Sequence, residues 1–335
     1  MEQPSSHDMN NHNHSIQRKA AIAWGKCTDH QGQVTISPIP NFDLDKTIFT
    51  TLEGKLPRMV IEAKIAKSVL WNDTRAQEIE EAYTEVRKQH NIPNVRTDLI
   101  DFMVKECDFN MEHADGSFLD HLLFCHDYSA LYFPDQSPTI QLLHSILGTA
   151  TNTFAMKAEK IPSLYALLSE EERTHVEAFP SILRLITSLT LIEELSQNMQ
   201  RLDDLASIRF HRVIDNHSCT MSAEDLWNQL NHQLVHFVDF LPAANWAHHS
   251  SDPVLQSFAR LSVFLDQAQK RRAKVEITFP QPKGPLSKPT NETLSFGSKV
   301  SSFIPSSLKK KLAAKSVRKF SQKINHSLEY TLEWK

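Results

Sequence analysis

The scarcity of glycine is the feature that most constrains this chain, which has seven glycines in 335 residues. That is about 2%, where globular proteins average about 7%. Glycine serves tight turns, bulges and the loops that hold nucleotide phosphates, so β-rich folds and dinucleotide-binding folds are both disfavoured. The sequence is rich instead in Leu, Ala, Glu, Gln, Lys and Arg, which are good helix formers. We therefore predict an all-α fold.

The apolar spacing predicts one helical body over residues 57–279. Ser169 and Glu172 have the spacing of a capping box at a helix start, and we expect a break in that helix near Pro180. The helices that we expect in this body span residues 75–91, 96–107, 117–133, 137–148, 160–187, 190–204, 222–240 and 253–272.

The segments that flank this body are less regular. Residues 1–20 are rich in Asn, His, Ser and Gln, a composition typical of disorder, and residues 21–56 are expected to be extended or irregular. Polar and apolar residues alternate in 33–37 and again in 274–279. This alternation predicts a small two-stranded ribbon that joins the two ends of the body.

Charge is divided unevenly along the chain, although the formal net charge is only −4. Residues 271–335 hold 14 Lys and Arg against 4 Asp and Glu, whereas residues 1–270 hold 22 against 36. The acidic body argues against nucleic-acid binding.

Residues 280–305 are proline-rich and predict a linker. Beyond them we expect a basic amphipathic tail helix, 306–335. It should dock through residues 306–325 on an anionic membrane or on an acidic protein surface, and the acidic body of this chain is one such surface.

The four cysteines Cys27, Cys107, Cys125 and Cys219 are widely spaced and contain no C-x-x-C pair. Such spacing favours reduced thiols over a disulfide framework or a zinc knuckle. The N-terminal stretch lacks an apolar signal-peptide region, and there is no apolar run long enough for a transmembrane helix. We expect a cytoplasmic protein.

A histidine cluster lies in a stretch flanked by Gly116 and Gly148, which are the only glycines between residues 54 and 284. His121 and His144 fall on the apolar faces of consecutive predicted helices, and His113 lies eight residues before the first of them. A buried imidazole must either find hydrogen-bond partners or ligate a metal ion. The residues alone leave both interpretations open.

The segment Phe118-Leu-Asp-His121-Leu, followed by Leu142-Leu-His144-Ser145-Ile-Leu-Gly148, resembles the HD-type metal-dependent phosphohydrolase superfamily. In that superfamily one helix supplies a histidine and the next supplies an adjacent His-Asp pair. A family of uncharacterised HD-like helical domains is more similar still. The resemblance implies an HD-like helical domain that holds a divalent Fe, Mn or Zn ion and hydrolyses a small substrate, phosphorylated or not.

The chain departs from this pattern in two places. Ser145 stands where the superfamily has its metal-binding aspartate, and serine is a poor ligand for these metals. Gly148 and Thr149 replace the acidic pair of the alarmone hydrolases, which the spacing otherwise resembles. We therefore expect a mononuclear site on His113, His121 and His144. A metal ion held there with one open coordination position would lower the pKa of its bound water to near 7.

Further ligands must come from downstream helices. His211 and Asp215 are spaced i, i+4, as are His232 and His236, and this spacing puts two side chains on one helix face. For His232 and His236 we favour a solvated polar face, and for His211 and Asp215 a surface or salt-bridged pair is the alternative to metal binding. The complete candidate set comprises the metal ligands His113, His121, His144, His211 and Asp215, and the catalytic candidates His113, Asp115 and Ser145.

Two other functions stay open beside the hydrolase. His211, His236 and Asp266 follow the order of late ligands in HD-like non-haem iron oxygenases. Alternatively, Ser145 and the lost acidic pair are what a degenerate HD-like scaffold would show, which binds a ligand or partner without turnover.

Overall fold

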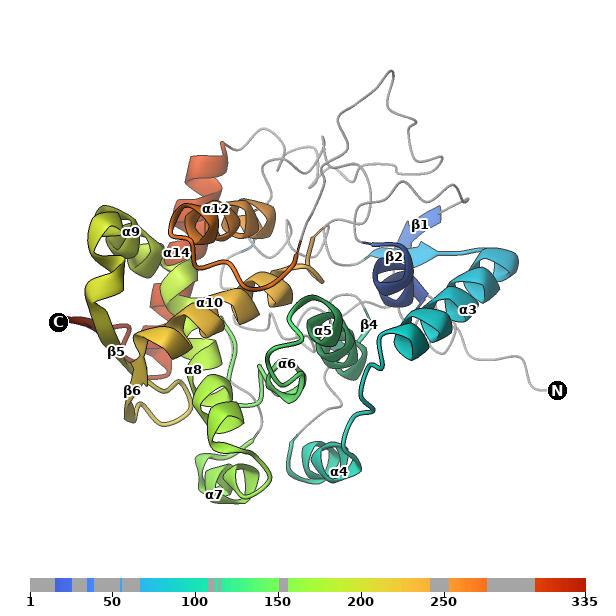
Figure 1. Cartoon of the computed structure of the whole chain (residues 1–335), viewed down its shortest axis with the longest axis horizontal. Helices are drawn as coiled ribbons and strands as arrows, with labels where there is room; N and C mark the ends of the chain where they lie inside the picture. Colours follow the sequence, from blue (N-terminus) through green and yellow to red (C-terminus); the bar gives the residue numbers. More distant parts are fainter. Residues whose placement is uncertain are drawn as a thin grey trace.

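The protein, seen in a computed structural model, is mostly helical and carries a small antiparallel sheet (Figure 1). The predicted all-α class is confirmed. The structure describes residues 16–25, 35–38, 55, 67–107, 112–113, 116–150, 156–241, 253–275 and 305–335. The α-helices labelled in Figure 1 are α3 (Asp73–Gln89), α4 (Thr97–Glu106), α5 (Phe118–Tyr132), α6 (Thr139–Leu142), α7 (Ile161–Tyr165), α8 (Glu170–Thr187), α9 (Thr190–Gln197), α10 (Ala223–Phe237), α12 (Pro253–Gln267) and α14 (Ser306–Lys323).

Local signals explain several helix ends. The predicted capping box is present at α8, where Ser169 and Glu172 exchange side-chain and backbone hydrogen bonds of 3.2 and 2.9 Å. The expected break near Pro180 is wrong, because α8 runs through this proline to Thr187. The helix expected over 137–148 is α6 alone, and turns follow it up to Gly148, whose φ of 134° favours glycine.

Helix α10 lies in the interior and packs against α5, α8 and α12 (Figure 1). Leu226, Leu230 and Leu234 are each 0% exposed, in agreement with the apolar face that their spacing marks. The opposite, polar face is buried as well, since His232 is 0% and His236 5% exposed. The expectation that these two histidines lie on a solvated face is therefore wrong. Neighbouring helices cover α10 on several sides, and its polar groups have to be satisfied inside the protein.

A three-stranded antiparallel sheet, ordered β6-β5-β7, joins the middle of the chain to its C-terminal end. Strand β5 (Leu205–His211) pairs on one side with β6 (Ser218–Ser222) and on the other with β7 (Thr331–Trp334). Ile208 of β5 faces Met221 and Leu332 in the register, and all three are buried. The strands alternate buried and exposed residues and place one apolar face on the helices.

The C-terminal segment belongs to the body and is not a detached tail. Helix α14 packs against α8 and α12, and β7 completes the sheet. Arg184 of α8, which is 0% exposed, donates hydrogen bonds to Ser321 Oγ and His326 Nδ1 and lies over the ring of Phe320. The expectation of one tail helix over 306–335 is wrong, because α14 ends at Lys323 and strand β7 follows it. Among the surfaces expected to receive the helix, it is the body of this chain on which its apolar residues bury.

The N-terminal flank also differs from expectation. Residues 16–24 are helical, although disorder was expected up to residue 20, because Ile16 and Ala20 bury on one side of this helix. Strand β1 (Thr35–Pro38) lies within the predicted ribbon region but pairs with β2 (Lys67–Leu70). The predicted partner, 274–279, is not a strand over residues 274–275. Residues 276–279 and the predicted linker up to 304 lie outside the described residues.

Among the described residues, no single helix is long and apolar enough to cross a membrane. Helices α8 and α9 pass the same test when they are taken together, but they bend by 78° at the break between them.

Candidate metal centre

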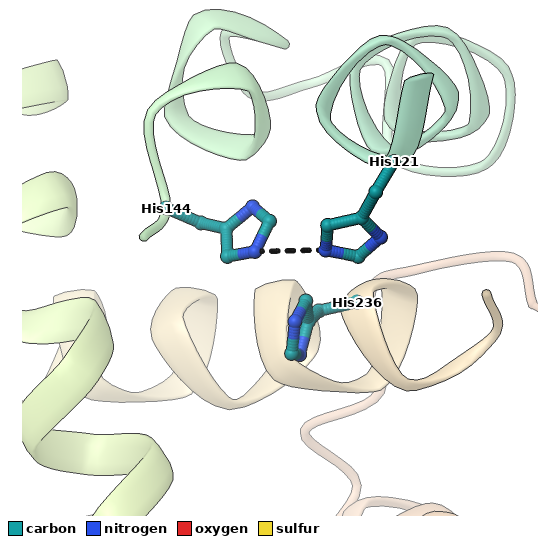
Figure 2. Close-up of side chains that lie close together, drawn as sticks. All are labelled: His121, His144 and His236. Atoms are coloured by element: carbon teal, nitrogen blue, oxygen red, sulfur yellow. Dashed lines mark hydrogen bonds between the residues drawn. The ribbon is translucent and has the colours of Figure 1, made fainter. Parts of the chain in front are cut away.

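Three buried histidines from three different segments meet in the helical interior (Figure 2). His121 lies on α5, His144 follows α6, and His236 lies in the last turn of α10. They are 1%, 2% and 5% exposed. One ligand atom of each lies within 4.8 Å of the others. The predicted pair is therefore brought together, and α10 supplies a third imidazole that the interpretation as a solvated face had left out.

The two predicted histidines face each other through their Nε2 atoms, which are 3.2 Å apart (Figure 2). Nitrogen ligands at 2.0–2.1 Å from a tetrahedral metal ion would lie about 3.3 Å apart. The His121 and His144 rings cross at 87° with their centroids 5.0 Å apart. The rings of His144 and His236 are closer, with centroids at 4.4 Å. The spacing suits imidazoles that share one ion.

The Nδ1 atoms of both rings face hydrogen-bond acceptors. His121 Nδ1 lies 2.7 Å from Asp239 Oδ2, and His144 Nδ1 lies 2.6 Å from the carbonyl oxygen of Gln141. A carboxylate and a carbonyl accept, so in each neutral ring Nδ1 carries the proton and Nε2 keeps its lone pair. Two lone pairs then point at each other, and a shared cation would satisfy both. The alternative is a proton on one Nε2 atom, which then donates a hydrogen bond to the Nε2 lone pair of the other ring.

A buried ion pair of Asp239 and Arg18 contacts His121 on its Nδ1 side. Asp239, near the end of the α10 segment, accepts hydrogen bonds of 3.1–3.2 Å from the Arg18 guanidinium, and both residues are buried, at 7% and 6% exposed. A carboxylate that holds the outer nitrogen of a metal-ligating histidine fixes its ring and raises its basicity. The N-terminal helix therefore reaches the candidate site through Arg18. Asp239 lies two residues beyond the end of α10, and its spacing of three from His236 is the sequence signal for its role.

Burial controls the charge of the cluster. The pKa of His144 lies well below its usual range, because burial penalises the imidazolium form and the neighbouring His121 charge adds to that effect. Phe179 packs near both His144 and His236, at ring-centroid distances of 5.0 and 5.4 Å. The low pKa keeps His144 in the neutral form that binds metals.

The other predicted site residues are placed differently. His113 lies on β3 (Glu112–His113), which pairs with β4 (Gly116–Ser117) just before α5, and its side chain lies outside the description. Asp115 falls outside the described residues. Ser145 directly follows His144 and is 4% exposed.

His211 and Asp215 do not join the cluster. The expected helical face is wrong, because His211 lies on strand β5 and Asp215 lies in the turn that leads to β6. The Asp215 carboxylate accepts two hydrogen bonds from Arg212, at 2.9 and 2.5 Å, so its salt-bridge partner is Arg212 and not the expected His211. His211 Nδ1 lies 3.2 Å from the carbonyl oxygen of Glu329. Asp266 of α12, named for the oxygenase, pairs with Arg271, so two of the three late ligands of that alternative are engaged elsewhere.

Comparisons of the chain with protein-family models, curated proteins and solved structures find no match, so the resemblance to the HD-type superfamily stays a prediction.

Proposed function

We propose that His121, His144 and His236 hold one divalent transition-metal ion, and that the protein is an HD-like metal-dependent hydrolase of a small substrate. The observation that carries the proposal is the convergence of three buried imidazoles whose ligand atoms all lie within 4.8 Å of one another. Helix α5 supplies the first histidine and the turn after α6 supplies the second, in the chain order that the resemblance implies. The third comes from a downstream helix.

The donor set narrows the choice of metal. Three imidazole nitrogens favour Zn²⁺ or Fe²⁺, whereas Mn²⁺ prefers carboxylate, carbonyl and water oxygens. With three protein ligands, a four-coordinate ion would keep one position open for water, and it would lower the pKa of that water to near 7. Asp239 orients the ring of His121, and the buried surroundings of the three histidines exclude bulk water from the cluster. Hydrolysis is the reaction class that such a set supports best.

Metal analysis of the purified full-length protein tests this proposal. We expect about one equivalent of zinc or iron per chain, and its loss in His121→Ala, His144→Ala and His236→Ala. The matched control is His90→Ala, because His90 is exposed at the end of α3 and its loss should leave the metal in place. Full occupancy in the His121→Ala, His144→Ala double variant would contradict metal binding by this cluster.

Burial favours a second candidate, a metal-stabilised scaffold without turnover. All three histidines are nearly inaccessible, and Ser145 stands where a carboxylate ligand is expected. A structural site is closed, whereas a catalytic site keeps a position open to substrate. The two candidates separate in an assay with a panel of phosphate and carboxylate esters. Metal-dependent ester cleavage that disappears in His144→Ala supports the hydrolase, and metal without cleavage supports the scaffold.

We also propose that the protein works in the cytoplasm. The cysteines at 107, 125 and 219 are free thiols that are buried in the described part of the chain. Free buried thiols are usual where the compartment is reducing.

A further inference from the structure

Helix α14 has two faces of different character. Ala314, Val317 and Phe320 are buried against the body, at 4%, 0% and 7% exposed. Leu308 and Leu312 are 48% and 47% exposed. Successive residues of an α-helix are rotated by about 100°, which puts the two leucines together on the side that faces away from Val317. The body thus holds the helix by one face and leaves two neighbouring leucines on the other.

The same outward face carries positive charge. Lys311 and Lys315 are exposed, and at about 100° per residue they flank Leu308 and Leu312 on this side of the helix. Over its full length α14 contains six lysines and one arginine and has no acidic residue. We define the outward face as Leu308, Lys311, Leu312 and Lys315.

We propose that the outward face of α14 docks on an anionic lipid bilayer. Leucines can enter the boundary between headgroups and acyl chains, while the lysine stems reach along the apolar surface and hold their ammonium groups at lipid phosphates. Anionic lipid attracts each added lysine, so the charges and the leucines act together.

Two features favour a lipid surface over a protein partner. The only arginine of α14, Arg318, donates a hydrogen bond to the carbonyl oxygen of Ser188 in the body. Its guanidinium is therefore engaged by the body and does not belong to the outward face. The outward face then offers no aromatic or arginine anchor of the kind that dominates protein–protein interfaces. Because α14 is already folded on the body, binding does not have to form the helix, and a small face can serve.

The test is sedimentation of the full-length protein with vesicles of phosphatidylcholine alone or mixed with phosphatidylserine. We expect binding to the mixed vesicles only, and a steep fall when the salt concentration is raised, since the attraction is screened over about 10 Å at 0.1 M. A Lys311→Glu, Lys315→Glu variant should lower the partition coefficient at least about tenfold. A Leu308→Ser, Leu312→Ser variant should lower it by about the same factor.

The matched control is Val104→Ser on α4, an apolar residue that is 65% exposed and lies outside the outward face. It should bind like the unchanged protein, and circular dichroism should show that all variants keep their helical content. Absence of binding to phosphatidylserine vesicles would overturn the proposal, as would lysine or leucine variants that bind these vesicles as well as the unchanged protein does. Binding to immobilised polyglutamate without binding to vesicles would identify an acidic protein surface instead.

Discussion

At the scale of the residue, the central question is how Asp239 and Arg18 support the imidazole cluster. Asp239 touches both His121 and Arg18, so one carboxylate orients a candidate ligand and compensates a buried cation. The histidines could be placed by spacing, but the role of Asp239 depends on a contact 118 residues away in the chain. The partner from the N-terminal helix is still more distant, at 221 residues.

Asp239→Asn should weaken metal binding by about 10- to 100-fold, because the amide no longer orients His121 or raises its basicity. It should also lower the free energy of unfolding by about 3–5 kcal/mol, since Arg18 is left buried without its counter-charge. Chelator competition measures the first effect and urea unfolding the second. Asp135→Asn, at an exposed carboxyl, is the control. Unchanged metal affinity in Asp239→Asn would show that this carboxylate does not support the site.

At the scale of the element, α14 and β7 illustrate how one segment can be basic, amphipathic and yet integral to the body. The basic composition of residues 306–325 correctly indicated a helix with an apolar face. The composition did not show what that face contacts. In the structure it packs on the body, where Arg184 of α8 donates hydrogen bonds to Ser321 and His326. Strand β7 then pairs with β5 more than 120 residues away.

Two substitutions in α14 separate its buried and exposed faces. Phe320→Ala should lower the free energy of unfolding by about 3–5 kcal/mol, because it removes a buried ring and leaves a cavity beside Arg184. Leu312→Ala should change it by no more than about 0.5 kcal/mol, because its side chain is half exposed. Urea unfolding of both variants gives the comparison. Equal small effects would show that the helix does not pack on the body.

At the scale of the whole molecule, buried histidines couple stability to pH. The pKa of His326 is lowered to about 4, chiefly by burial. Its neutral ring fits its contacts, since Arg184 donates to Nδ1 while Nε2 lies 2.9 Å from the carbonyl oxygen of His211. The pKa of His175 is lowered as well, because it is buried. Both groups are therefore neutral in the folded protein at pH 7.

The free energy of unfolding should fall as the pH drops from about 6.5 towards 4. The unfolded chain takes up a proton on each histidine near pH 6.5, whereas the folded chain holds His326 neutral down to about pH 4. Each such histidine contributes at most about 1.4 kcal/mol per pH unit. Urea unfolding at pH 7.5, 6 and 5 measures the slope, and His326→Asn should reduce it. His90→Asn, at an exposed histidine, should leave the slope unchanged.

The sequence by itself determined the helical class and the positions of most helices, since these depend on local propensity, capping and apolar spacing. Helices α3, α4, α5 and α10 end within a few residues of their predicted bounds. The pairing of His121 with His144 also followed from local pattern, because both fall on apolar faces of consecutive predicted helices, although His144 lies in the turn after α6.

Only the tertiary structure determined which residues these elements contact and which of their faces are buried. Strand β7 joins β5 and β6 through pairing with β5 across more than 100 residues, which local pattern does not report. His236 looked solvated because polar residues usually face water. It is buried because α5 and α8 cover the polar side of α10. A single helix shows which residues share a face, and the packing of its neighbours determines whether that face meets water, protein or a metal ion.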